Sequence, residues 1–184
     1  MAEHVRPFWV GYLLLSPVRK LITNPARILR PYVKPGMKVL DAGTAMGFFS
    51  LPLARLVGES GHVVCVDLQE KMIASLKKRA VRAGLDGRME YRVCTQDSLA
   101  IDDLAGTLDF AIAIAVVHEA PDARRFLAGI FDALKKGGSL LFSEPAGHVS
   151  EDGFDGSLSL ARAVGFEIHG VPRILRSHSA LLTK

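Results

Sequence analysis

Cysteine is scarce in this chain, with only Cys65 and Cys94 among 184 residues. Each lies within a predicted strand, and their separation matches no metal-binding or redox motif. We therefore expect two buried core thiols in a reducing compartment, with no disulfide framework and no metal site. This composition favours a cytoplasmic protein.

Long apolar runs are lacking as well. The N-terminal run over residues 7–15 is far too short to cross a bilayer, and no small-residue cleavage site follows it. The chain also contains no internal repeat and no low-complexity segment. We expect no association with a membrane.

A strong charge of one sign is missing too, because 23 lysines and arginines against 19 aspartates and glutamates leave a net charge of +4. A modest basic cluster consists of Lys71, Lys77, Lys78, Arg79 and Arg82. On a helix these side chains project to solvent, so we interpret them as a solvated face rather than a nucleic-acid footprint. Hydrophobic residues make up 49% of the chain, which is enough for one globular domain with a proper core.

Strand-like and helix-like patterns alternate along most of the chain. In residues 1–35, Ser16-Pro17 and Asn24-Pro25 each predict an N-cap followed by proline at the first helical position. Strands are then expected at residues 38–41, 62–67, 89–94, 109–116 and 139–143. Helices are expected at residues 49–57, 70–83, 122–136 and 150–164, and Pro52 fits only in the first turn of its helix. Two further strand-like runs, 166–171 and 177–182, are expected to form a hairpin around Pro172.

This order of elements predicts an α/β fold with a Rossmann-like doubly wound sheet of about seven strands in three αβα layers. The sheet should be mostly parallel, since each crossover carries a helix. Two consecutive C-terminal strands without a helix between them predict one reversed strand. We divide the chain into an N-terminal helical lid segment, residues 1–35, and a ligand-binding domain, residues 36–184.

The segment Val39-Leu-Asp-Ala-Gly-Thr-Ala-Met-Gly47 has the form of a strand, a tight turn and a helix N-terminus. That junction is the usual place for a nucleotide-like ligand in a doubly wound sheet. Glycines let a ligand approach the backbone, and Asp67 ends the next strand-like run. An acid about twenty residues after the loop can accept both hydroxyls of a ribose.

The chain resembles the class I S-adenosylmethionine-dependent methyltransferases over nearly all of residues 35–184, and its closest likeness is to their small-molecule branch. The resemblance implies S-adenosylmethionine as cofactor and methyl transfer to a small-molecule acceptor. Each motif is weak alone, but together they occur in the right order and spacing. They are Val39 to Gly47, Cys65-Val-Asp67, Gln96-Asp97, Ile114-Ala-Val-Val-His-Glu-Ala-Pro-Asp122 and Lys136-Gly-Gly-Ser-Leu-Leu-Phe-Ser-Glu-Pro145.

The same resemblance implies a set of cofactor-binding residues. The first loop and its strand supply Asp41, Gly43, Thr44, Ala45 and Gly47; the second strand supplies Asp67, Leu68 and Gln69; the next two supply Gln96, Asp97, Ala115 and Val116. Asp41 would help to hold the methionine amino group, Asp67 the ribose and Asp97 the adenine amino group. Each of these aspartates has an alternative role. Asp41 fits a loop cap, Asp67 a cap of the helix near Glu70, and Asp97 a cap of a short helix over residues 98–104.

Ala45 departs from the family pattern, which usually has glycine at this position. Alanine is compatible with the loop if its φ is negative and its methyl group avoids the ligand. The departure bears on affinity and loop shape more than on the class of ligand.

The acceptor site should follow the fourth strand, where His118 and Glu119 are the candidate catalytic residues. A histidine there can remove a proton from a hydroxyl, amine or thiol near neutral pH. Alternatively, it only shapes the pocket. Glu144 either contacts the substrate or caps a helix, and Trp9 and Tyr12 either form a substrate-binding lid or pack a peripheral helix on the sheet.

Three other functions compete with this interpretation. An RNA methyltransferase is disfavoured because base N-methylators of this superfamily often carry Asn/Asp-Pro-Pro-aromatic where this chain has Val-His-Glu-Ala-Pro. A module that binds S-adenosylmethionine without turnover stays open, given Ala45. A nicotinamide oxidoreductase is disfavoured because the glycine spacing does not fit a dinucleotide loop. The acceptor atom and the oligomeric state stay undetermined.

Overall fold

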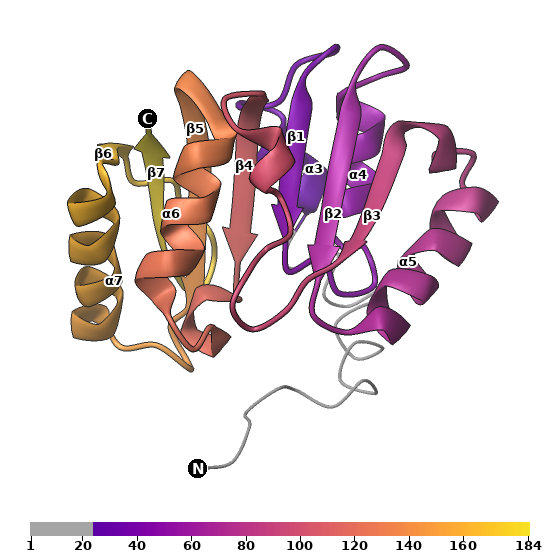
Figure 1. Ribbon diagram of the computed structural model, residues 1–184. Coiled ribbons are helices and arrows are strands. Elements are labelled where there is room, and N and C mark those ends of the chain that lie inside the picture. Colours follow the sequence, from indigo (N-terminus) through magenta and orange to yellow (C-terminus); the bar gives the residue numbers. More distant parts are fainter. Residues whose placement is uncertain (1–23) are drawn as a thin grey trace.

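A seven-stranded sheet forms the centre of the molecule (Figure 1). The computed structural model describes residues 24–184, so Ser16-Pro17 and the rest of residues 1–23 lie outside the described part of the chain. The strands occur in the order β3-β2-β1-β4-β5-β7-β6. Their bounds are β1 (Lys38–Ala42), β2 (His62–Asp67), β3 (Met89–Val93), β4 (Leu108–Ile114), β5 (Leu134–Pro145), β6 (Glu167–Gly170) and β7 (Ser177–Thr183).

The predicted strand directions are confirmed. β1 lies between β2 and β4 and runs parallel to both, while β3 and β5 extend the parallel part on either side. β7 is antiparallel to both β5 and β6, so it is the one reversed strand. The order reverses between β1 and β4, and that switch point opens a crevice at the carboxyl ends of the strands.

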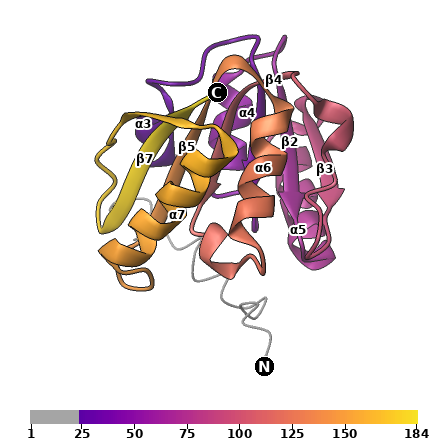
Figure 2. The same ribbon diagram turned by 60° about the vertical axis from the view of Figure 1, so that its left-hand side comes forward.

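Helices cover both faces of the sheet (Figures 1 and 2). The helices α3 (Pro25–Leu29), α4 (Ser50–Leu56) and α5 (Glu70–Arg82) supply buried residues to the apolar cluster on one face. The helices α6 (Ala123–Ala133) and α7 (Glu151–Val164) do so on the other face. Three 3-10 turns complete the described elements: η1 (Asp86–Arg88), η2 (Asp102–Leu104) and η3 (Val117–Glu119).

The central strands are buried on both faces. In β1, Val39 packs into the cluster beneath α4 and α5, whereas Leu40 packs into the cluster beneath α6 and α7. Both are fully buried. This alternation follows the two-residue period of a strand, and it explains why the central strands read as continuous apolar runs.

Several helix boundaries follow the predicted local signals. The Asn24 side chain accepts a hydrogen bond from the Arg27 backbone N–H, with Pro25 at the start of α3. Pro52 lies in the first turn of α4, as predicted. Asp122 and Ser150 cap α6 and α7 in the same way as Asn24 caps α3. Such caps satisfy N–H groups that have no partner within the helix.

Two helix predictions are wrong, and the strands expected at residues 109–116 and 139–143 are observed as β4 (Leu108–Ile114) and β5 (Leu134–Pro145). The helix expected over residues 122–136 ends at Ala133, because Leu134 is extended and pairs with Leu108 to begin β5. Residues 98–104 form no helix beyond the single turn η2. Cys65 is buried as expected and Cys94 is partly buried, just after β3. Among the described residues no helix is long and apolar enough to span a bilayer.

Candidate functional site

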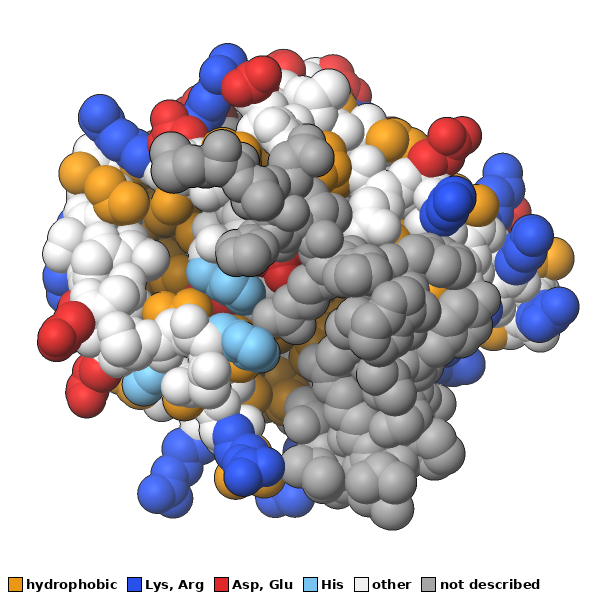
Figure 3. Space-filling view, turned by 90° about the horizontal axis from the view of Figure 1, so that it is seen from below, with side chains coloured by type: hydrophobic (Ala, Val, Ile, Leu, Met, Phe, Trp, Pro, Cys, Tyr) orange, Lys and Arg blue, Asp and Glu red, His pale blue; other side chains and the backbone are white. Residues whose placement is uncertain are grey.

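A pocket of about 740 Å³ opens at the carboxyl edge of the sheet. Its walls come from the segments that follow β1, β2, β3 and β4 and from one side of α6. Figure 3 looks onto this edge, where histidine side chains gather beside hydrophobic ones. The volume lies within the usual range for pockets that bind small molecules or cofactors, roughly 300–1,000 Å³.

Most of the predicted site residues line this pocket. They are Gly43, Thr44, Ala45, Asp67, Leu68, Gln69, Gln96, Asp97, Ala115, Val116 and Glu119. Asp41, Gly47, His118 and Glu144 are not among its lining residues. Trp9 and Tyr12 lie outside the described residues, so their substrate-binding role stays a prediction.

The loop after β1 is held over the end of β2 by its own backbone. The N–H groups of Gly43 and Thr44 both donate to the carbonyl oxygen of Val66, at 2.8 and 3.0 Å. The next N–H group, that of Ala45, donates to Oδ2 of Asp67 at 2.8 Å. This arrangement brings bare main chain and a carboxylate to the same side of the pocket.

Both backbone conformation and close packing explain why glycine occupies positions 43 and 47 in the loop. Gly43 and Gly47 have φ angles of +83° and +86°, where a side chain is strained. A Cβ on Gly43 would lie 2.6 Å from a methyl group of Val116, and one on Gly47 would lie 2.3 Å from a methyl group of Leu76. The positive φ and the close approach to Val116, after β4, and to Leu76, on α5, therefore both favour glycine at these positions.

Ala45 does not meet the expected condition of a negative φ, because its φ is +47°. The left-handed conformation costs a non-glycine residue roughly 1–2 kcal/mol. The hydrogen bond from its N–H to the Asp67 carboxylate offsets part of that cost. Ala115, on the opposite wall, has a φ of +59°, so two strained alanines border the pocket.

Asp67 is held between two backbone donors. Its Oδ2 accepts from Ala45 and its Oδ1 accepts from the N–H of Gln69 at 2.9 Å. Burial raises the pKa of this carboxyl and outweighs the lowering by the two hydrogen bonds. An ionised carboxylate offers about four acceptor sites, so two stay available to hydroxyl groups in the pocket.

Asp41 lies beneath the loop and is almost fully buried. The hydroxyl of Ser50, at the start of α4, donates to its Oδ2 at 2.5 Å. Burial raises the pKa of Asp41 to about 7, and the charge of Asp67 adds to the increase. Contact between this carboxyl and a ligand would therefore have to pass through the loop or an intervening group.

Asp97 extends from the loop after β3 into solvent, with 85% of its side chain exposed. It lies 3.8 Å from the guanidinium of Arg125 on α6. The short helix that it would have capped is absent, so that alternative is wrong. Arg125 and Phe126 of α6 also line the pocket and were not predicted as site residues. Phe126 packs against the core as well, so its apolar character indicated burial rather than a site.

His118 and Glu144 are brought together from the ends of β4 and β5. Nδ1 of His118 lies 2.6 Å from Oε2 of Glu144, and the backbone N–H of His118 donates to Oε1 at 3.1 Å. Nε2 of His118 lies 3.7 Å from Oε1 of Glu119. The ring of His148 is parallel to that of His118, with centroids 6.3 Å apart.

Glu144 has only 1% of its surface exposed, which argues against the predicted contact with a substrate. Its partner is His118 rather than a helix N-terminus, because α7 is capped by Ser150. His148 and Glu119 line the pocket, so the His118 ring, with 21% of its side chain exposed, lies at the rim of the pocket.

Comparison with known proteins agrees with this geometry. Residues 33–168 match the sequence model of a family described as a methyltransferase domain. The ubiquinone/menaquinone biosynthesis C-methyltransferase UbiE of Cronobacter sakazakii is 29% identical over 145 residues, which cover 77% of this chain and 53% of that protein. The human mitochondrial ubiquinone biosynthesis O-methyltransferase is 34% identical over 109 residues, covering 59% and 28%.

Among solved structures, a S-adenosylmethionine-dependent methyltransferase from Aquifex aeolicus superposes with a TM-score of 0.84 at 22% identity. The match covers 97% of this chain and 100% of that one, and at this identity it shows the fold. The chain spans about half the length of the UbiE protein that it matches. The family match extends over most of the chain and includes every pocket-forming strand, and so this chain belongs to the methyltransferase-domain family, with the class I fold.

Proposed function

We propose that this protein transfers a methyl group from S-adenosylmethionine to a small-molecule acceptor. The observation that carries the proposal is the Asp67 carboxylate, which lines the pocket directly beside the main chain of the glycine loop. A ribose with two neighbouring hydroxyls needs paired acceptors of this kind next to a backbone it can approach closely.

The residues present fit this cofactor. Asp67 keeps acceptor sites available after its two backbone hydrogen bonds. The same wall of the pocket continues with the residues that would border the adenine: Leu68, Gln69, Gln96 and Asp97. Ala115 and Val116 form the opposite side. When bound, the sulfonium of S-adenosylmethionine supplies an already reactive methyl group. The protein then contributes alignment and exclusion of water, and alignment can lower a barrier by roughly 7–11 kcal/mol.

The charge of the pocket favours a neutral or cationic acceptor over a nucleic acid. Among the described residues, the lining includes six carboxylates and one guanidinium: Asp67, Asp97, Asp102, Glu119, Asp122 and Asp132 against Arg125. A cationic cofactor is attracted to such a wall, whereas phosphate groups are repelled. The names of the UbiE and human relatives support a quinone-type acceptor, so catechol and hydroquinone are suitable soluble probes.

Ligand-induced stabilisation tests the proposal. We expect S-adenosylmethionine and S-adenosylhomocysteine to raise the Tm, because ligand at a hundred times its Kd adds about 2.7 kcal/mol to stability. For a chain of this size that corresponds to roughly 5–10 °C. NAD and NADP should leave the Tm unchanged.

Two variants make the experiment specific. Asp67→Ala should reduce the shift strongly, whereas Asp155→Ala, an exposed position on α7, should retain it. Circular dichroism of Asp67→Ala confirms that it is folded. Equal shifts with NAD, or a full shift in Asp67→Ala, would contradict the proposed site.

A further inference from the structure

Glu144 is buried at the end of β5 with both carboxylate oxygens directed at one residue. Oε2 is 2.6 Å from Nδ1 of His118, and Oε1 accepts the backbone N–H of the same residue at 3.1 Å. Only 1% of Glu144 is exposed. Burial of a carboxylate is costly unless the group is paired and hydrogen-bonded. The two contacts with His118 therefore replace the water that would stabilise an exposed carboxylate.

The contact determines what each nitrogen of His118 can do. Nδ1 faces a carboxylate at short range, so it carries the proton and donates it to Glu144. In the neutral ring Nε2 then has the lone pair and can accept a proton. The backbone hydrogen bond to Oε1 adds a second restraint, so ring and main chain are held by one side chain.

The Nε2 side of the ring faces the pocket wall. Within residues 24–184, the charged and titratable groups seen to contact His118 include Glu119 on η3, at 3.7 Å from Nε2, Glu144 on β5, and His148, whose ring lies parallel to it. Glu119 and His148 both line the pocket. His178, although opposite Glu144 in the sheet, instead stacks on Phe154.

We propose that Glu144 is a positioning residue that fixes His118 with Nε2 unprotonated, so that this nitrogen takes the proton of an acceptor bearing an O–H or N–H group. The inference rests on the proposed methyl transfer. As the acceptor heteroatom forms its bond to the methyl carbon, the carbon–sulfur bond breaks and its electron pair stays on sulfur. The acceptor proton passes to Nε2, and Glu144 stabilises the resulting imidazolium before the proton leaves to solvent.

Nitrogen NMR of the histidine rings in the full chain tests the positioning without any acceptor. We expect His118 in the Nδ1–H form, assigned from His118→Gln, and a clear loss of that form in Glu144→Gln. Glu144→Asp, which keeps a carboxylate, should restore it in part. An Nε2–H ring in the unmodified protein, or an unchanged ring in Glu144→Gln, would overturn the inference.

Kinetics with catechol give a second readout. Glu144→Gln should lower kcat by about 10-fold or more, because it weakens a positioned base that contributes roughly 100–10,000-fold. It should also shift the acid limb of the pH–rate profile and leave the Kd for S-adenosylhomocysteine within about twofold of the original. An unchanged kcat and profile in a protein that turns over catechol would also overturn the inference.

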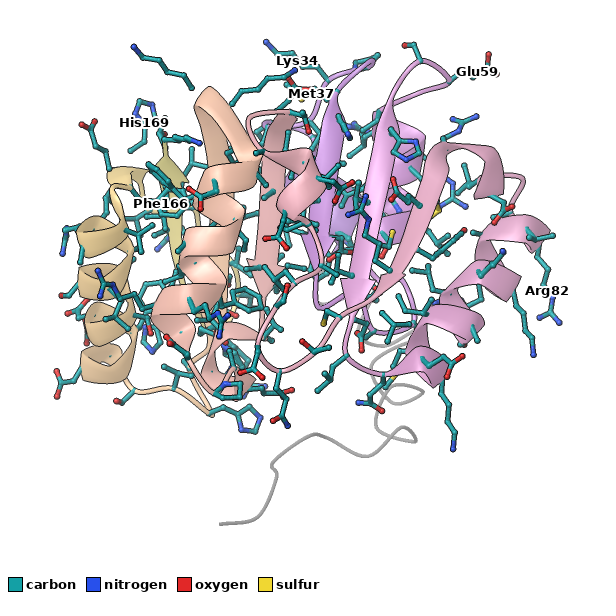
Figure 4. The ribbon with its side chains drawn as sticks, viewed as in Figure 1. Lys34, Met37, Glu59, Arg82, Phe166 and His169 are labelled. Atoms are coloured by element: carbon teal, nitrogen blue, oxygen red, sulfur yellow. The ribbon has the colours of Figure 1, made fainter. Side chains whose placement is uncertain are left out.

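A matched control is available at the opposite edge of the sheet. Glu59 lies at the amino ends of the strands, on the same edge of the molecule as Lys34 and Met37 and far from the carboxyl edge (Figure 4). Glu59→Gln makes the same chemical change there and should alter neither the His118 ring nor turnover. If S-adenosylhomocysteine fails to bind while the Nδ1–H form is present and depends on Glu144, the proposed function fails and the positioning of His118 stands.

Discussion

Asp41 is the residue whose ionisation is most perturbed by the fold within the cofactor loop region. Its carboxyl is almost fully buried and receives one side-chain hydrogen bond, from Ser50. Burial raises its pKa from 3.8 to about 7, so the folded state holds a proton that the unfolded chain releases near pH 4. The stability of the fold therefore falls as the pH rises from about 4 to 7, because over that range the folded state binds more protons.

Asp41→Asn should remove this dependence. We expect the variant to gain stability relative to the unmodified protein as the pH increases, by up to a few kcal/mol at pH 8, at roughly 1.4 kcal/mol per pKa unit. Urea unfolding at pH 5, 6.5 and 8 measures the difference, with Asp155→Asn as the exposed control. A variant that is less stable at pH 8 than at pH 5, relative to the unmodified protein, would contradict the raised pKa.

At the scale of elements, helix starts depend on single capping side chains. The hydroxyl of Ser150 accepts the N–H of Gly153 at 3.1 Å and satisfies one donor at the start of α7. Ser159, in the middle of the same helix, instead donates its hydroxyl to the carbonyl of Asp155 at 2.9 Å. The first contact stabilises the helix, whereas the second competes with its backbone ladder.

Ser150→Ala should therefore cost about 1 kcal/mol of unfolding free energy, the usual price of a lost N-cap. Ser159→Ala, the same substitution within α7, should change stability by less than about 0.5 kcal/mol because alanine is the better helix former. Chemical denaturation of both variants measures the contrast. Equal effects would mean that Ser150 does not act as a cap.

The C-terminal end of α6 was not predicted correctly. The apolar period of α6 continues into Leu134, so the sequence favoured a helix as far as the glycine pair at Gly137. In the structure Leu134 pairs with Leu108 and turns extended, which starts β5 earlier. Pairing with a strand that is distant in the sequence sets this boundary, and local periodicity does not predict such pairing.

At the scale of the whole molecule, the loop after β1 is locked to α5. Gly47 packs so closely on Leu76 that an added Cβ would lie 2.3 Å from its methyl group. Arg79 of the same helix donates to the carbonyl oxygen of Met46. The pocket wall formed by this loop therefore depends on how α5 sits against the sheet, and not on the loop sequence alone.

Gly47→Ala should destabilise the protein more than Gly84→Ala. Both glycines have positive φ, but a Cβ on Gly84 meets nothing within 4 Å, so that variant reports the strain alone, roughly 1–2 kcal/mol. In a double-mutant cycle, Leu76→Ala should offset part of the extra cost, with a coupling of about 0.5–3 kcal/mol. Additive effects in the cycle would show that the loop and α5 are not in contact.

The order of strands and helices along the chain, the reversed strand and the Asn24 cap could be predicted from the amino-acid sequence. They follow from period, capping and turn chemistry, which act between residues a few positions apart. The family was indicated instead by the resemblance of several motifs in order. The place of Asp67 at the pocket could also be predicted, because an acid at the end of a parallel strand lies beside the glycine loop, whereas its role toward a ribose stays a prediction.

The contacts between the site residues could not be predicted from the sequence, because they join residues that are far apart along the chain. Ala45 adopts a positive φ, and the Asp67 carboxylate, 22 residues away, accepts its N–H. Glu144 meets His118 across 26 residues because β4 and β5 are neighbours in register, which buries the carboxylate that sequence reasoning assigned to the substrate. Contacts of this kind depend on which strands pair and in what register, and that is settled by burial of the whole sheet rather than by any local pattern.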